Sequence, residues 1–265
     1  PILGLGEAFR KDTNPRKINL SVGVYKDAAG NTPILASVKS AEKRLLESET
    51  NKAYLPIEGA PQYGKLVREL LFGADHEAAA SGRSVTCHTP GGTGALRVAA
   101  DFLKKKLPVA RVWFSKPTWD NHLNIFSSAG LQVDTYAYID AAGKALDFDA
   151  MLASLGQIPT GDAVLLHAGC HNPTGIDPTP EQWRKIADVI HERGLLPIVD
   201  FAYQGFGVGI REDAAGLAEL TRPGKELLVC SSFSKNFGLS CERVGALTIV
   251  AKDKAAADTV QSQVK

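Results

Sequence analysis

The sequence predicts an α/β fold, namely a doubly wound and mostly parallel sheet with helices on both faces. Two observations predict it. From residue 84 onward, short apolar segments typical of buried strands alternate with longer segments of helical periodicity, and the connections between them are short. In addition, polar residues such as Asp200 and Lys235 directly follow such apolar segments, as expected where parallel strands present their carboxyl ends to a ligand.

The strands and helices are expected in alternation. The expected strands are 84–88, 109–114, 133–138, 163–167, 195–200, 226–230 and 245–250. The expected helices between them include 94–103, 120–129 and 148–155. A further helix should begin at Pro180 with Thr179 as its N-cap and end at Gly194, because these residues favour those positions.

The chain divides into three expected regions. Residues 1–33 form an N-terminal arm with an extended segment around 19–23, and residues 34–75 form the helical part of a smaller, incomplete domain, with helices near 34–49 and 62–72. Residues 76–265 form the large α/β domain. The sequence opens without methionine and closes inside an expected helix, so we expect a fragment that lacks a C-terminal part.

Composition narrows the classes of function. The 265 residues are 44% apolar and 22% charged with a net charge of +1, which gives no support for a nucleic-acid or membrane partner. No secretory signal or membrane-spanning run is present. Three of the four cysteines lie in or beside apolar strand-like runs, without a metal spacing, which favours buried free thiols and a cytoplasmic location.

Lys235 lies in a serine-rich turn directly after an apolar strand. A lysine amine forms an imine only when neutral, and burial or neighbouring cations lower its pKa. The hydroxyls of Ser231, Ser232 and Ser234 could bind phosphate. A single lysine in this place is more commonly a solvated surface group, so Lys235 needs partners elsewhere in the chain.

Asp200, Tyr203 and Asn172 supply such partners. Asp200 ends an apolar strand, where an unpaired carboxylate is costly. It is either a cap or ion-pair partner, or it faces a pyridine nitrogen and keeps the ring an electron sink. Tyr203 and Asn172 could hydrogen-bond a phenolic oxygen of that ring, although an Asn-Pro pair is also a common turn.

The glycine-rich segment 91–94 follows an expected strand and begins an expected helix, and we interpret it as an anion-binding site. It lacks the lysine of a phosphate-binding loop, so nucleotide binding is poorly supported. Arg243 could clamp a phosphate or pair with Glu242. Trp119 could stack on a planar ring or pack in the core.

Metal binding and hydrolase chemistry are disfavoured. His167 and His171 have the spacing of a helical zinc pair, but they straddle a strand end and a proline turn. A hydrolase dyad of Cys170 and His171 is disfavoured because adjacent strand residues point apart. We therefore expect no metal.

Taken together, the motifs resemble the class I aspartate and aromatic aminotransferases of fold type I. The resemblance runs through seven segments: 19–27, 54–59, 90–97, 117–122, 171–178, 200–205 and 231–245. It implies pyridoxal 5′-phosphate as cofactor, bound covalently to Lys235, which would also move protons. Asp200 would pair with the pyridine nitrogen, with His122 behind it.

The resemblance assigns further roles. Asn172 and Tyr203 would hold the ring oxygen, and Trp119 would stack on the ring. The phosphate would be bound by four residues: Gly92, Thr93, Ser232 and Arg243. In a homodimer Tyr54 would reach the neighbouring subunit's phosphate. Gly23, Trp119 and Asn172 would line the substrate pocket, and the Asn172–Pro173 bond would be cis.

The implied activity is the ping-pong transfer of an amino group between aspartate, or an aromatic amino acid, and 2-oxoglutarate. Thr93 favours aspartate as the substrate, whereas segment 54–59 is also typical of relatives that act on aromatic amino acids. A pyridoxal-phosphate lyase or β-decarboxylase and an inactive fragment remain alternatives. Relatives usually carry tyrosine at position 240, here Ser240, which we interpret as a local packing change. The family's arginines that read substrate carboxylates are not in this sequence.

Overall fold

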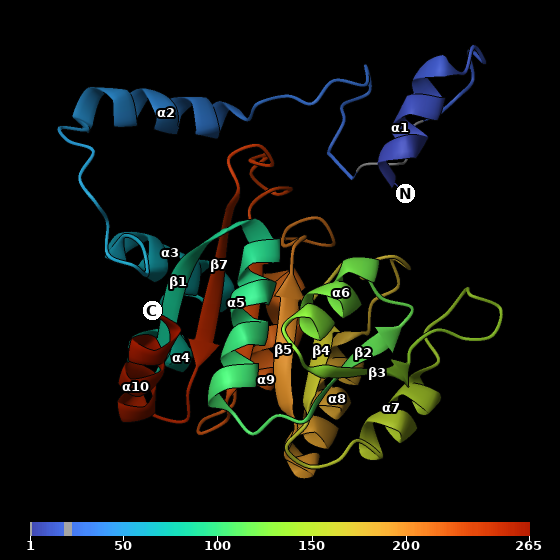
Figure 1. Cartoon of the computed structure of the whole chain (residues 1–265), viewed down its shortest axis with the longest axis vertical. Coiled ribbons are helices and arrows are strands. Elements are labelled where there is room, and N and C mark those ends of the chain that lie inside the picture. Colours follow the sequence, from blue (N-terminus) through green and yellow to red (C-terminus); the bar gives the residue numbers. More distant parts are fainter. Residues whose placement is uncertain (1, 19–22) are drawn as a thin grey trace. The chain divides into compact units, whose positions relative to one another are not determined.

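The computed structural model describes residues 2–18 and 23–265, and Figure 1 shows the chain. The chain divides into two compact units, residues 1–49 and residues 50–265. The three regions expected from the sequence have different boundaries and stay a prediction. The extended segment expected around 19–23 lies almost wholly outside the described residues.

Among its described residues, the first unit has two helices, α1 (Ile2–Lys11) and α2 (Ala36–Ser48). Helix α2 was expected near residues 34–49, whereas α1 was not predicted. None of the residues of α2 is buried. After α1, the ammonium of Lys17 lies 4.5 Å from the centre of the Phe9 ring and donates to the Phe9 carbonyl at 2.7 Å.

The second unit is built around a seven-stranded sheet with the order β1-β7-β6-β5-β4-β2-β3. The strands are β1 (Ser84–Pro90), β2 (Arg111–Lys116), β3 (Gln132–Ala137), β4 (Ala163–His167), β5 (Leu196–Phe201), β6 (Leu227–Ser232) and β7 (Val244–Val250). Strands β6, β5, β4, β2 and β3 run parallel, while β7 is antiparallel to both of its neighbours. The predicted doubly wound, mostly parallel fold is confirmed.

Helices connect and cover the strands. They are α3 (Pro61–Phe72), α4 (Glu77–Ala80), α5 (Gly91–Lys106), α6 (Asp120–Ser128), α7 (Phe148–Gly156), α8 (Pro180–Arg193), α9 (Ala215–Leu220) and α10 (Lys254–Val264), with a 3-10 turn at Glu212–Ala214. Helix α5 begins three residues before the expected start. The short helices α4 and α9 were not predicted.

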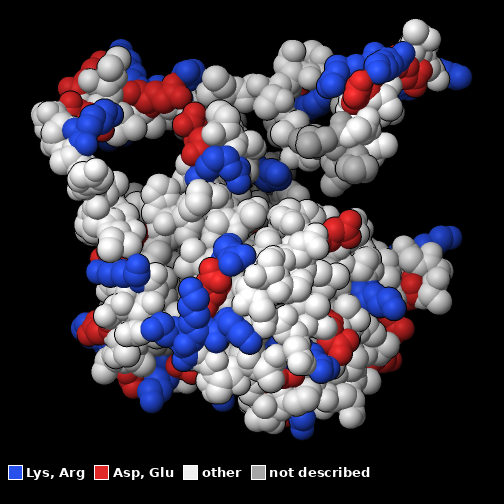
Figure 2. Space-filling view, viewed as in Figure 1, with Lys and Arg blue, Asp and Glu red and all other residues white. Residues whose placement is uncertain are grey.

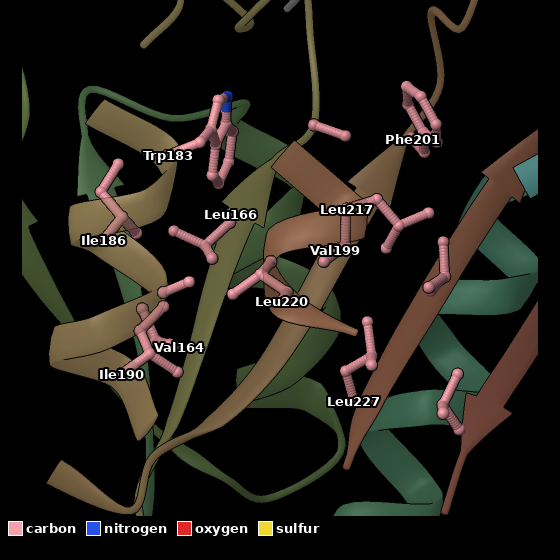
Figure 3. Close-up of a cluster of buried hydrophobic side chains, with 14 of the residues drawn as sticks. Val164, Leu166, Trp183, Ile186, Ile190, Val199, Phe201, Leu217, Leu220 and Leu227 are labelled. Carbon is pink, nitrogen blue, oxygen red and sulfur yellow. The ribbon is translucent and has the colours of Figure 1, made fainter. Parts of the chain in front are cut away.

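Two apolar clusters hold helices on opposite faces of the sheet. Along β6 the side chains alternate between them, since Leu227 and Val229 belong to one cluster and Leu228 and Cys230 to the other. Figure 3 shows the first cluster, which α8 and α9 cover. Helices α5, α6 and α10 cover the second. Each fully buried aliphatic side chain contributes about 1.5–3 kcal/mol.

Helix α8 follows the prediction from its caps. The Thr179 hydroxyl accepts from the Gln182 amide, and the Gln182 side chain accepts from the Thr179 amide, which forms a capping box. Pro180 is the first helical residue, and Gly194 ends the helix with a left-handed φ of 62°. Local chemistry therefore sets both ends of α8.

The surface and the cysteines fit the composition. Figure 2 shows basic and acidic side chains interspersed over the visible face. Cys87 and Cys230 are buried free thiols, Cys170 is partly buried and Cys241 is exposed. Within the described ranges, no helix combines the length and apolar character needed to cross a bilayer.

Candidate active site

The candidate residues converge at the carboxyl ends of three parallel strands. Asp200 of β5 is paired in register with His167 of β4 and with Cys230 of β6. Lys235 follows the end of β6 by three residues. Because neighbouring parallel strands end at the same sheet edge, the topology brings a carboxylate and an amine together there.

A buried histidine holds the Asp200 carboxylate. His122 Nε2 lies 2.7 Å from Asp200 Oδ2, and the two side chains are 0% and 11% exposed. The imidazole comes from the first turn of α6 and packs against the rings of Phe114 and Trp119. The carboxylate is thus paired with a buried imidazole and keeps a small exposed surface.

The hydrogen bonds behind Asp200 form a directed chain. The Asn172 amide donates to His167 Nδ1 at 3.3 Å, and His167 Nε2 lies 3.2 Å from the Thr118 hydroxyl. That hydroxyl lies 2.8 Å from His122 Nδ1. Burial, followed by the charges of neighbouring histidines, holds the pKa of His167 well below its usual value.

The direction of the chain follows from its first donor. A backbone amide can only donate, so neutral His167 carries its proton on Nε2 and donates to Thr118. Thr118 then donates to Nδ1 of His122, whose Nε2–H points to Asp200. The chain therefore ends with an N–H of His122 directed at the Asp200 carboxylate.

Lys235 has the electrostatic surroundings of a reactive amine. Burial, followed by the positive charge of Arg243, lowers its pKa, while Asp200 acts in the opposite direction. Tyr203 lies in the same field, since burial and then the charge of Asp200 raise the pKa of its phenol. At neutral pH the phenol is protonated and can donate a hydrogen bond.

An anion cradle lies where α5, β6 and the loop after Lys235 meet. A Cβ added at Gly91 would lie 2.4 Å from Arg243 Nη2, and one added at Gly92 would lie 2.9 Å from Ser232 Cβ. Within the described residues, no side chain caps the N-terminus of the 16-residue helix α5. Unpaired amides and a guanidinium at one helix start favour an anion.

Ser240 and Ser234 position Arg243. The guanidinium donates to the Ser240 carbonyl at 2.9 Å and to the Ser234 hydroxyl at 3.3 Å. The Ser240 hydroxyl in turn donates to the Ser234 carbonyl at 2.8 Å. Arg243 has a left-handed φ of 56°. The hydrogen bonds of Arg243 are with the loop that carries Lys235. Among the described residues, no ion pair joins Arg243 to Glu242.

The chain matches the family model described as aminotransferase class I and II over residues 15–265. It belongs to this family. It is 57% identical to the aspartate aminotransferase of Escherichia coli strain K12 over 265 residues, covering all of this chain and 67% of the relative. It is 49% identical to the aromatic-amino-acid aminotransferase of Pseudomonas aeruginosa over 263 residues, covering 99% of this chain and 66% of the relative.

Solved structures give the same family. A crystal structure of an aromatic amino acid aminotransferase from Burkholderia cenocepacia matches with a TM-score of 0.96 at 52% identity, over all of this chain and 66% of that one. The Burkholderia pseudomallei aromatic-amino-acid aminotransferase, covalently bound to pyridoxal phosphate, matches with a TM-score of 0.96 at 46% identity over the same shares. The chain thus spans about two thirds of the length of its relatives.

Pyridoxal phosphate, the cofactor of this aminotransferase family, fits the residues present. The cradle at Gly92 and Arg243 suits its phosphate, the Asp200 carboxylate suits a protonated pyridine nitrogen, and Lys235 offers an amine for its aldehyde. The Asn172–Pro173 bond is cis, as the resemblance implied, and so is the Lys116–Pro117 bond, which was not predicted.

Gly23 and Tyr54 are not among the residues that these contacts join. Gly23 belongs to the first unit, so its place relative to the site is not described. Tyr54 is fully exposed.

Among the described residues, no group of three or more histidine, cysteine or acidic residues could hold a metal ion. His171 instead bonds Ser115 and Thr174, both at 2.8 Å.

Sequence reasoning missed two residues that shape the site. Thr118 links two histidines. The Asp177 carboxylate accepts from the amides of Cys170 and His171 at 2.7 and 2.8 Å, and so fixes the turn before Asn172. An aspartate six residues after a buried histidine in a proline turn was the available signal for Asp177.

Proposed function

We propose that the chain carries the pyridoxal-phosphate site of an aminotransferase that moves amino groups between aspartate, or an aromatic amino acid, and 2-oxoglutarate. One observation carries the proposal. Asp200, paired with buried His122, lies at the same sheet edge as Lys235, and the charge of Asp200 acts on the lysine amine. A pyridine ring needs a carboxylate and an amine at opposite ends, and this edge supplies both.

Each residue has a distinct part in this function. When bound, pyridoxal phosphate supplies an aldehyde and an electron-withdrawing ring. Lys235 would supply the amine that binds it and would then move a proton at the substrate's α-carbon. Asp200 would pair with the ring nitrogen. Tyr203 and Asn172 would donate to the ring oxygen and so stabilise its negative charge.

The remaining assignments concern the phosphate, the ring face and the substrate. Arg243 and Ser232, with the amides of Gly92 and Thr93, would bind the phosphate. Trp119 lies just before α6, beside His122, and would cover one ring face. Gly23, Trp119 and Asn172 would line the substrate pocket.

Substrate preference remains divided between two relatives of similar closeness. The Escherichia coli aspartate aminotransferase is 57% identical, and the Burkholderia cenocepacia aromatic enzyme is 52% identical. Specificity constants for aspartate and phenylalanine would separate the two. Pyruvate or alanine in place of oxaloacetate as the product from aspartate would instead favour a lyase or β-decarboxylase.

A homodimer in the cytoplasm is the expected setting. Tyr54 is fully exposed, and Leu55 and Ile57 beside it are 63% and 77% exposed. An apolar groove of ≈ 320 Å³, lined by residues that include Leu66 and Phe237, lies in the same unit. Exposed apolar surface of this kind favours a protein interface. A purely monomeric sedimentation profile would contradict this proposal.

Cofactor binding provides the direct test. Purified protein titrated with pyridoxal phosphate should develop the visible absorbance of a lysine-bound cofactor, because Lys235 is the amine placed to bind it. Lys235→Ala should abolish the band, whereas Lys252→Ala, at an exposed lysine beyond β7, should leave it unchanged. A band that survives Lys235→Ala would disprove the assignment.

A further inference from the structure

The Asp213 carboxylate collects hydrogen bonds from four backbone amides of one loop. Oδ2 accepts from Gly205 at 2.8 Å and from Gly207 at 3.0 Å, and Oδ1 accepts from Val208 at 2.8 Å and from Gly209 at 3.3 Å. We call residues 205–209 the glycine loop. It begins two residues after Tyr203.

The loop sequence allows the carboxylate to approach the backbone. A Cβ added at Gly207 would lie 2.6 Å from Asp213 Oδ1, and one added at Gly209 would lie 2.3 Å from Glu212 Oε2. Gly205 has a left-handed φ of 94°, which side-chain-bearing residues rarely adopt. Larger residues at positions 207 and 209 would push these acidic side chains away.

Tyr203 bonds the glycine loop through its backbone, and its neighbour Gln204 is held by contacts outside that loop. The Phe206 amide donates to the Tyr203 carbonyl at 3.0 Å. Gln204, only 3% exposed, donates to the carbonyls of Leu70 and Ile210 at 3.0 and 2.9 Å. A change in the backbone of the glycine loop therefore acts directly on Tyr203, which follows Asp200 by three positions.

Asp213 also lies against the segment that leads to Asn172. A Cβ added at Gly169 would lie 3.9 Å from Asp213 Cβ. The charge of Asp213 acts on the Cys170 thiol, whose pKa is raised first by burial and then by Asp177 and Asp213. The carboxylate thus lies between the loops that carry Tyr203 and Asn172.

We propose that Asp213 is a positioning residue for the cofactor site, holding the Tyr203 and Asn172 loops so that both side chains can donate to one ring oxygen. The proposal rests on the function proposed above. A carboxylate has only acceptors, so it satisfies four amide donors that an amide side chain could not all satisfy. Its neutralisation leaves amides unpaired and frees the loop.

The first test uses the cofactor as a spectroscopic probe. Losing a hydrogen bond to an ionised oxygen raises that oxygen's pKa. The pH midpoint of the bound cofactor's visible band should therefore rise in Tyr203→Phe and also in Asp213→Asn. In the double variant, Asp213→Asn should add less than half of the shift that it causes alone.

A matched control separates positioning from general loop damage. Asp140 also accepts from backbone amides of its own loop, those of Lys144 and Ala145 at 2.8 and 3.3 Å. Its loop connects β3 with α7 and takes no part in the proposed site. Asp140→Asn should leave the midpoint where it is in the unmodified chain.

The second test needs no cofactor. In Asp213→Asn, amide hydrogen exchange of residues 205–209 should speed up at least tenfold, and in Asp140→Asn it should not change. If Asp213→Asn does not fold, Gly207→Ala displaces the same carboxylate by its Cβ. It should produce the same midpoint shift and the same faster exchange.

The outcomes distinguish two failures. An unchanged midpoint, unchanged exchange, or fully additive shifts in the double variant would overturn the role of Asp213 and leave the proposed function intact. Absence of the visible band in the unmodified protein, or its survival in Lys235→Ala, would overturn the proposed function and the role of Asp213 with it.

Discussion

The histidines behind Asp200 show how single residues set the charge of the site. His167 and His171 have ring centroids 4.3 Å apart, and His171 stacks on Tyr138 at 3.9 Å. Burial and then His122 lower the pKa of His171 to about 4. Two neighbouring imidazoles can be buried in this way only while both are neutral.

Acid should therefore destabilise the protein through these histidines. Their pKa values are lower in the folded chain than the usual 6.5, so the unfolded chain binds more protons between about pH 4 and 6.5. Stability rises with pH across that window and is lost as pH falls. Between pH 7.5 and pH 5 the loss from His171 is on the order of 2 kcal/mol. Thermal unfolding between pH 5 and 7.5 measures it.

Two variants sharpen this prediction. His171→Gln should flatten the pH dependence of the unfolding midpoint, because it removes one of the groups that takes up a proton on unfolding. His88→Gln, at an exposed position of β1, should leave the slope unchanged. Equal slopes in all three proteins would contradict the assignment.

Single residues also show why some residues of the candidate site could be predicted from the sequence and others could not. Lys235, Asp200 and Tyr203 stand out because polar residues at the ends of apolar strands are costly without a use. Thr118 and Asp213 do not, since a threonine or aspartate in a loop looks like any cap or turn. Their roles depend on partners 49 and 8 residues away.

At the scale of elements, helices with strong caps were predicted best. Helix α8 carries Pro180 at its start and Gly194 at its end, and both boundaries were predicted from them. Helix α9 has only six residues and no side-chain cap, so its sequence carries no pattern that predicts a helix. Helix α5 begins at Gly91, before the expected start, and Gly91 lies close to Arg243 and Gly245, a contact that the sequence does not reveal.

The C-cap of α8 gives a stability prediction. Gly194→Ala should lower the free energy of unfolding by about 1–2 kcal/mol, because alanine is strained at a φ of 62°. The new Cβ would also lie 3.2 Å from Thr160 Cγ2. Chemical denaturation measures the change.

Gly156 offers a matched control in the last turn of α7. A Cβ added there meets no atom within 4 Å, and its φ is not left-handed. Gly156→Ala should leave stability unchanged or raise it by up to about 1 kcal/mol. If both variants lost equal stability, the left-handed cap would not be the cause.

At the scale of the whole molecule, the stabilising interactions are distributed unevenly between the two units. The sheet, both apolar clusters and the residues from Trp119 to Arg243 all belong to residues 50–265. The first unit contributes Gly23 to the expected substrate pocket, and its helix α2 buries none of its residues. Cofactor binding and the fold should thus depend on the second unit alone.

A chain of residues 50–265 should therefore fold cooperatively and bind pyridoxal phosphate. We expect its dissociation constant to stay within about threefold of that of residues 1–265, a difference below 1 kcal/mol. Circular dichroism during heating and titration of the visible band provide the measurements. Leu166→Asp in the shortened chain, at a position 1% exposed, should abolish both signals because it buries an unpaired charge. A shortened chain that melts without cooperativity would show that residues 1–49 are needed to complete the core.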